Sequence, residues 1–193
     1  MSQRDVDHGS FDAWGYDLET VVEAAGLDRF PLLGISRGGS IAIAYAVKHP
    51  ERVTHLVLHG AFAAGVNHAG TPEEIEAHGA LASLLRLGWG LNNPAFCKTF
   101  TSRFIPEATP EHEQWFDELQ RVSTSPENAA RLLERGAEID VRPLLPQVKA
   151  PTLVLHCDRD GAVPPERGRA LAAGIPGARA RLAAERESPH ARG

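Results

Sequence analysis

Ser36 has one glycine two positions before it and another two positions after it, and it could act as a nucleophile. Residues 34–38 read Gly-Ile-Ser-Arg-Gly, after a short apolar run and before a helical pattern. A strand, a sharp turn and a helix are the context in which a G-x-S-x-G sequence presents Ser36 as a nucleophile. Such a turn is strained and crowded, so we expect side chains at positions 34 and 38 to collide with their surroundings. The alternative is a glycine-rich turn that packs closely or binds a phosphate at a helix N-terminus.

Two aspartates late in the chain could orient a catalytic base. Asp158 and Asp160 close the sequence TLVLHCDRD, directly after an apolar run. The carboxyl ends of parallel strands are the place where residues of an open α/β sheet converge on a ligand. The spacing from the strand favours Asp160, and Asp158 is the rival candidate. Either aspartate could instead cap the helix that we expect to begin near Pro164.

The base of such a set would be a histidine after the last strand, because its imidazole must reach both the serine hydroxyl and the carboxylate. His190 is the only histidine that follows Asp160 in the sequence. Three residues remain after it, so the alternative is a histidine in a terminal tail that nothing holds in place. The candidate serine, aspartate and histidine therefore follow one another in that order along the chain.

Apolar spacing places these candidates on a parallel sheet. Residues 11–25 have helical periodicity between Ser10, a candidate N-cap, and Gly26, a candidate C-terminal cap. Residues 30–35 and 53–58 are short apolar runs, typical of buried strands, and a helical pattern that ends before Pro50 joins them. A strand closing at TLVLHCDRD, a helix over 164–174 and a weak strand over 178–182 continue the pattern. This order predicts an α/β fold with a mostly parallel sheet flanked by helices.

Between these parts, residues 65–140 are predicted to form a helical insertion. Thr71 and Ser125 each precede a proline and an acidic residue, which is typical of a helix start. We expect the apolar stripe around Trp115 to pack on the sheet. Aromatic residues here could line an apolar acyl pocket, although at helical spacing they more often form core. They are Trp89, Phe96, Phe100, Phe104, Trp115 and Phe116.

Composition excludes several classes of protein. The 193-residue chain has a net charge of −5 with scattered basic residues, which disfavours nucleic acid as a partner. No apolar run approaches the roughly 20 residues of a membrane span, so we expect a soluble chain with no membrane partner. Cys97 and Cys157 form no CxxC pair, and no secretory signal precedes them, which favours a cytoplasmic location. His55 and His59 share a strand face without a third ligand nearby, so no metal and no cofactor are predicted.

Three segments carry a resemblance to a known family: GISRGG, HPERVTHLVLHG and APTLVLHCDRDGAVPPERGRALAAGIPGAR. From about residue 9 to residue 179 the chain resembles the α/β-hydrolase fold family, most of all the hydrolase-like domains fused in bacteria to transcriptional regulators or adenylate cyclases. The resemblance implies Ser36 as nucleophile, Asp160 as acid and a loop histidine, His190, as base. It also implies that residues 65–140 are a lid between two core parts, residues 1–64 and 141–193.

The chain departs from the family pattern at both ends. Family members have several strands before the helix that here starts at Phe11, and the residues after Arg181 also differ, so we expect a truncated hydrolase fold. Missing neighbours would leave residues 30–35 as an exposed apolar edge, at which the chain could self-associate. His8-Gly9 follows no strand and is rejected as the family's second oxyanion loop, which leaves the backbone N–H of Arg37 as the donor. Losing one donor typically costs about 10²–10³ in turnover, so we expect weak activity.

Two functions compete at this stage. The first is a serine hydrolase that acts on a small-molecule carboxylic ester or related acyl substrate through a Ser-His-Asp triad. The second is a non-catalytic ligand-sensing or interaction domain derived from the same fold. A truncated gene product without a function of its own is a third possibility.

Overall fold

The computed structural model describes residues 10–89, 94–105 and 108–183. Its elements are α1 (Phe11–Ala24), β1 (Phe30–Ile35), α2 (Arg37–Lys48), β2 (Val53–His59), α3 (Val66–Ala69), α4 (Pro72–Gly88), α5 (Pro94–Phe104), α6 (Pro110–Ser123), α7 (Pro126–Ala137), η1 (Arg142–Gln147), β3 (Thr152–Cys157), α8 (Pro165–Gly174) and β4 (Arg179–Ala183). His190 and His8-Gly9 lie outside the described residues. The chain divides into two compact units, one of which contains Ala64–Ile139, and the other Trp14–Ala63 with the described part of Asp140–Gly193.

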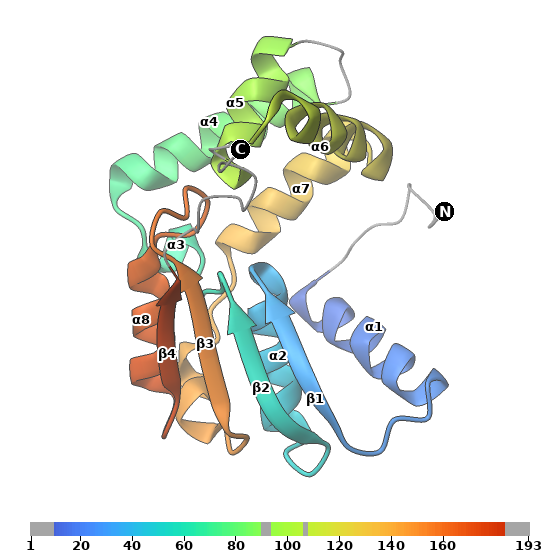
Figure 1. The fold of residues 1–193 in the computed structure, drawn as a ribbon, viewed down its shortest axis with the longest axis vertical. Helices are drawn as coiled ribbons and strands as arrows, with labels where there is room; N and C mark the ends of the chain where they lie inside the picture. The colour runs from blue at the N-terminus through green and yellow to red at the C-terminus, as the bar shows by residue number, and fades with distance from the viewer. Residues whose placement is uncertain (1–9, 90–93, 106–107, 184–193) are drawn as a thin grey trace, which may run out of the picture. The chain divides into compact units, whose positions relative to one another are not determined.

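The second unit is built on a four-stranded sheet in the order β1-β2-β3-β4, with every neighbouring pair parallel (Figure 1). The register places Ile35 beside His59, and His59 beside Leu155. The carboxyl ends of the first three strands therefore meet at the same edge of the sheet. The predicted α/β class and its parallel sheet are confirmed, including the weak last strand.

Helices cover one face of this sheet. Helix α2 packs on β1 and β2, α8 packs on β3 and β4, and the 3₁₀ helix η1 contacts both helices. Alternate strand residues point into this layer, because successive side chains of a strand face opposite sides. The side chains that are almost completely removed from solvent include Ile43, Leu56, Leu58, Val154, Leu171 and Ile175.

The opposite face of the sheet is open at β1 and β2. Leu33 and Ile35 are 57% and 58% exposed, and His55 and His59 are also exposed. In the described part of the chain β1 pairs with β2 alone, so it forms one edge of the sheet. Pro31, which has no N–H to donate, is tolerated at such an edge.

Helix α1 begins and ends as its sequence predicts. The Ser10 hydroxyl oxygen accepts from the Ala13 N–H at 3.3 Å, and Gly26 has a left-handed φ of 61°. Glu19 joins this helix to the end of α2, 2.6 Å from Lys48 Nζ and 2.9 Å from His49 Nε2. Hydrogen bonds from these two groups hold the pKa of Glu19 below its ordinary value.

The unit containing Ala64–Ile139 is helical, as predicted. A capping box starts α4: the Thr71 hydroxyl oxygen accepts from the Glu74 N–H at 3.3 Å, and the Glu74 carboxylate accepts from the Thr71 N–H at 2.8 Å. Ser125 caps α7 through the Asn128 N–H at 3.3 Å. No helix among the described residues is both long and apolar enough to cross a membrane.

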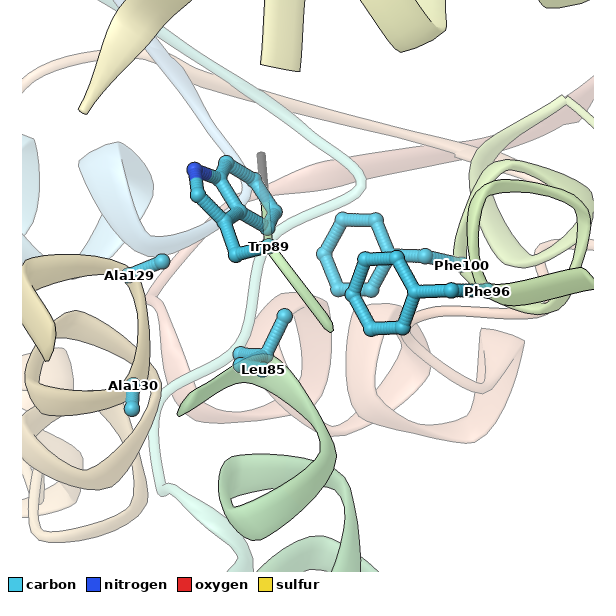
Figure 2. Packing of buried hydrophobic residues seen from close by; sticks show 6 residues of the cluster. All are labelled: Leu85, Trp89, Phe96, Phe100, Ala129 and Ala130. Carbon is cyan, nitrogen blue, oxygen red and sulfur yellow. The ribbon is translucent and has the colours of Figure 1, made fainter. Parts of the chain in front are cut away.

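Aromatic side chains form the core of this helical unit. Trp89, Phe96 and Phe100 are buried together with Leu85 and two alanines of α7 (Figure 2). The rings of Trp89 and Phe100 pack edge to face with centroids 5.2 Å apart, and Trp89 Nε1 donates to the Thr124 carbonyl at 3.1 Å. For these three aromatic residues the core interpretation is therefore correct.

For helix α6 the expected packing on the sheet stays a prediction. Its apolar stripe is not buried: Trp115 is 62% and Leu119 is 43% exposed, and α6 has no buried residue. Helix α6 contacts α5, where the Phe116 ring lies 5.8 Å from the Phe104 ring. Periodicity indicated the helix but not how much of its apolar face would find a partner.

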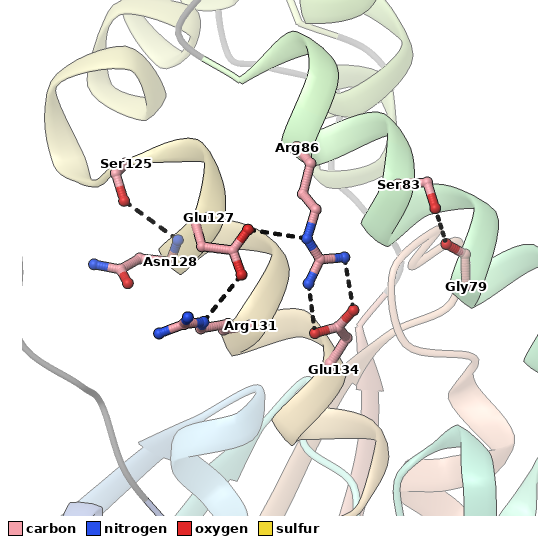
Figure 3. Close-up of polar contacts among 8 residues, drawn as sticks. All are labelled: Gly79, Ser83, Arg86, Ser125, Glu127, Asn128, Arg131 and Glu134. Carbon is pink, nitrogen blue, oxygen red and sulfur yellow. Dashed lines mark hydrogen bonds and ion pairs between the residues drawn. The ribbon is translucent and has the colours of Figure 1, made fainter.

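Ion pairs join α4 to α7 on the surface (Figure 3). Arg86 donates to both carboxylate oxygens of Glu134 at 2.8 and 2.9 Å, and its Nε donates to Glu127 at 3.0 Å. The second oxygen of Glu127 accepts from Arg131 Nε, also at 3.0 Å. These hydrogen bonds raise the pKa of Arg86 and hold the pKa of Glu127 below its ordinary value.

Candidate active site

Ser36 lies at the turn between β1 and α2, exposed to solvent and with a strained backbone. Its φ of 51° and ψ of −126° make it the only non-glycine residue with a positive φ in the described parts of the chain. Backbone hydrogen bonds hold the turn on both sides. The Ser36 N–H donates to the His59 carbonyl at 2.9 Å, and the Ser36 carbonyl accepts from Gly39 at 3.0 Å. Strain of this kind persists only where the surrounding structure enforces it.

The glycines around Ser36 are needed for close packing, but not at both of the predicted positions. A Cβ at Gly34 would lie 2.6 Å from Gly39 Cα and 2.9 Å from Ala42 Cβ, so no side chain fits there. The expectation for Gly38 is wrong, since a Cβ there would meet no atom within 4 Å. The second crowded position is Gly39, where a Cβ would overlap Ala61 Cβ. The turn is therefore closed by the approach of α2 to the strands.

Sequence reasoning missed the residue that anchors the first turn of α2. The Ser40 hydroxyl is completely buried and donates to the Phe62 carbonyl at 2.6 Å. This bond joins the helix N-terminus to the segment that follows β2. The only sequence signal was a second small polar residue, four positions after Ser36.

Arg37, the predicted oxyanion donor, is the first residue of α2. Its backbone amide lies directly after Ser36 in the chain, at the N-terminus of the helix. Its guanidinium carbon lies 4.8 Å above the ring centroid of Trp14, and burial lowers the pKa of Arg37. The side chain therefore rests on an aromatic ring while the backbone of Arg37 continues the turn.

Asp160 follows β3 at its carboxyl end, and its carboxylate is held by the backbone of its own loop. Oδ1 accepts from the N–H groups of Ala162 and Val163 at 2.9 and 2.8 Å, and the side chain is 20% exposed. Asp158 is exposed within the preceding turn. Helix α8 has Pro164 as its N-cap and no side-chain cap hydrogen bond, so neither aspartate caps it.

Gly60, which the sequence reasoning also missed, connects the serine end of the site to the acid. Its N–H donates to the Leu155 carbonyl at 2.9 Å, one residue after the carbonyl of His59 accepts from Ser36. Gly60 has a φ of 54°, and a Cβ there would lie 3.3 Å from Asp160 Oδ2. The end of β2 thus contacts both the nucleophile turn and the carboxylate loop. A glycine directly after a buried strand was the available signal.

His156 packs against the acid loop. It is 1% exposed, and its Nε2 lies 2.8 Å from the Val163 carbonyl and 3.6 Å from Asp160 Oδ2. A carbonyl can only accept, so Nε2 carries the proton. Buried Nδ1 has no hydrogen-bond partner among the described residues.

The described residues around Ser36 bring together groups of the kinds that acyl-transfer chemistry uses. They combine an exposed serine on a strained turn, a helix N-terminus and an oriented carboxylate. No group of three potential metal ligands occurs within residues 10–89, 94–105 and 108–183. His55 and His59 point from one face of β2 toward solvent.

Comparison with known sequences identifies the family of this site. A family model described as "alpha/beta hydrolase fold" matches residues 2–190. The chain is 32% identical over 164 residues to a 2-hydroxy-6-oxononadienedioate/2-hydroxy-6-oxononatrienedioate hydrolase of Klebsiella pneumoniae, covering 83% of this chain and 56% of that protein. It is 27% identical to a pimeloyl-[acyl-carrier protein] methyl ester esterase of Neisseria meningitidis, covering 85% of this chain and 54% of the esterase. The chain thus spans little more than half the length of these relatives.

Solved structures show the same fold. An esterase from Exiguobacterium antarcticum superimposes with a TM-score of 0.74 at 25% identity, covering 90% of this chain and 65% of the esterase. The enol-lactonase of Burkholderia xenovorans gives a TM-score of 0.71 at 25% identity, covering 91% of this chain and 65% of that enzyme.

Proposed function

Because the chain belongs to the α/β-hydrolase fold family, we propose that it is a serine hydrolase acting on a carboxylic ester or a related small acyl substrate. The observation that carries the proposal is the strained, exposed Ser36 at the N-terminus of α2, at the same sheet edge as Asp160. The relatives named as a hydrolase and an esterase, and the neighbours named as an esterase and an enol-lactonase, support this reaction class.

In the proposed reaction Ser36 Oγ attacks the carbonyl carbon of the substrate, and His190 takes the hydroxyl proton. The proton then passes to the leaving alcohol as the ester bond breaks, and water later releases the acid from the acyl-serine. Asp160 orients the imidazole through Oδ2, because Oδ1 already accepts from two backbone amides.

The backbone N–H of Arg37 is the proposed donor to the developing oxyanion. Its place at the N-terminus of α2 adds the positive end of the helix dipole to the stabilisation of negative charge. The lid role of residues 65–140 stays a prediction.

A fluorophosphonate probe tests the proposal directly, since an activated serine displaces fluoride from its phosphorus and keeps the phosphonyl group. We expect intact-mass analysis to show one adduct on the purified chain and none on Ser36→Ala. Asp160→Asn should slow labelling by about 10²-fold or more, because a triad acid orients the base. Asp158→Asn is the matched control and should label at the normal rate.

Two outcomes would reject the proposal. A folded chain that forms no adduct would favour the ligand-sensing interpretation instead. Equal slowing by Asp158→Asn and Asp160→Asn would remove the assignment of Asp160 as the acid. Circular dichroism of each variant separates either result from a loss of folding.

A further inference from the structure

We infer that His156 is a positioning residue that holds the Asp160 loop in shape. This inference extends the proposed function, since it concerns how the proposed acid is oriented. His156 is the last inward-facing residue of β3, and the Asp160 loop is defined here as residues 158–163. The imidazole contacts this loop through a hydrogen bond to its last residue, Val163.

Two hydrogen bonds run in series from the sheet to the carboxylate. His156 Nε2 donates to the Val163 carbonyl at 2.8 Å, and the Val163 N–H donates to Asp160 Oδ1 at 2.8 Å. The Ala162 N–H adds a second donor to the same oxygen at 2.9 Å. Val163 is therefore held on both sides of its backbone, and the direction of the carboxylate depends on where Val163 lies.

The burial of His156 indicates a role for this bond beyond filling space. Its Nδ1 is buried without a hydrogen-bond partner in the described chain, and an unsatisfied buried nitrogen is unfavourable for stability. A leucine of similar size would avoid that cost. What only the histidine supplies is the Nε2–H bond to Val163, which ties the loop to the strand.

Helix α8 fixes the ring in the orientation that this bond needs. Gly168 faces the imidazole so closely that a Cβ there would overlap Nδ1. The missing side chain at this position creates the space for the ring, and α8 prevents its movement away from β3. The carboxylate oxygen Oδ2 lies 3.6 Å from Nε2, beyond hydrogen-bond distance, so the ring supports the loop without occupying the oxygen that we propose orients the base.

Amide hydrogen exchange tests this role independently of catalysis. In His156→Leu the Val163 carbonyl loses its donor, and we expect the Ala162 and Val163 amides to exchange at least about 10-fold faster. In His156→Gln the side-chain amide nitrogen can reach the place of Nε2, so protection should return toward the wild-type level. Gly168→Ala pushes on the unchanged ring and should also loosen the loop. Unchanged exchange in both His156→Leu and Gly168→Ala would overturn the inference.

A double-mutant cycle separates positioning of the acid from a general loss of structure. His156→Leu should slow fluorophosphonate labelling by between about 10- and 100-fold in the wild-type background, since small misplacements of catalytic groups are costly. In the Asp160→Asn background it should add little further slowing, because the group that it positions is already disabled. Full additivity of the two substitutions would contradict a role through Asp160.

The same experiments distinguish the failure of this inference from the failure of the proposed function. If Asp160→Asn alone leaves labelling unchanged, the proposed acid is wrong, whereas the exchange data still decide whether His156 holds the loop. If Asp160→Asn slows labelling and His156→Leu changes neither exchange nor labelling, the proposed function stands and His156 has no positioning role.

Discussion

Individual atoms decide whether the turn at Ser36 can form. The backbone of Ser36 is strained, and a Cβ at Gly34 or at Gly39 would overlap neighbouring atoms. Gly38 belongs to the same motif but faces open space. Glycine costs stability in a helix or a strand through its backbone entropy. Close packing explains glycine at positions 34 and 39, but not at position 38.

Two alanine substitutions test this difference. Gly34→Ala should destabilise the chain by about 1–3 kcal/mol, because its Cβ would lie 2.6 Å from the backbone at Gly39. Gly38→Ala is the control, and should leave stability unchanged or raise it by about 0.5–1 kcal/mol, since Ala favours the helix. Urea unfolding followed by circular dichroism measures both values. Equal destabilisation by the two changes would contradict the packing described for this turn.

At the scale of elements, α4 and α7 are joined by a buried core and by a surface ion-pair network. Leu85 of α4 and Trp89, the residue that follows α4, pack against Ala129 and Ala130 of α7, while Arg86 pairs with residues of α7 on the solvent side. Surface ion pairs stabilise proteins only weakly, and salt screens them. Their contribution should therefore show in how the stability of the folded chain depends on pH and salt.

Arg86→Met should weaken the acid dependence of stability. Hydrogen bonding to Arg86 holds the pKa of Glu127 below its ordinary value of 4.5. This contribution is fully present above pH 4.5 and is lost as the pH falls through the lowered value in the folded chain. Thermal unfolding at low salt should show a melting temperature a few degrees lower for the variant at pH 7, with a smaller loss on acidification.

Arg121→Met is the control for the Arg86 experiment. Arg121 pairs with Glu118, three residues earlier in α6. The substitution therefore removes an ion pair within one helix and not one between two helices. We expect a smaller change in melting temperature at pH 7 than for Arg86→Met. A larger effect at Arg121 than at Arg86 would show that joining α4 to α7 is not what the network contributes.

For the whole molecule, the exposed edge of the sheet is the feature with the largest consequence. The register of β1 on β2 directs alternate residues toward β2, so that within the described residues the N–H groups of Leu33 and Ile35 lie at the unpaired edge. The patch around this edge is apolar and carries no acidic side chain on its strands: Pro31, Leu33, Ile35, His55 and His59. Identical edges are self-complementary about a two-fold axis, so the occupant that we propose is a second copy of this chain.

Leu33→Lys should reduce self-association, because a charge on an edge strand opposes pairing with another edge. Sedimentation velocity over a range of protein concentrations would show the wild-type chain shifting to larger species and the variant remaining a monomer. Leu87→Lys is the control, since Leu87 is more exposed than Leu33 but lies on α4. Association that Leu87→Lys abolishes and Leu33→Lys leaves intact would contradict pairing through β1.

Local patterns in the sequence were sufficient to predict the elements of the α/β fold and the candidate residues near the sheet edge. The parallel pairing of the strands followed from the βαβ pattern, and the helix starts at Ser10, Thr71 and Ser125 followed from hydrogen bonds made within four residues. The turn at Ser36 was predictable for the same reason, since G-x-S-x-G encodes a local backbone conformation.

Contacts between distant residues were decided only by the tertiary structure. The crowding at Gly39 depends on Ala61, the space at Gly168 depends on His156, and the anchoring of Ser40 depends on Phe62. The ring contact between Phe116 of α6 and Phe104 of α5 likewise joins two separate helices. Periodicity and capping are read along one segment, whereas packing joins segments that the sequence keeps apart, so these details became visible only in the folded chain.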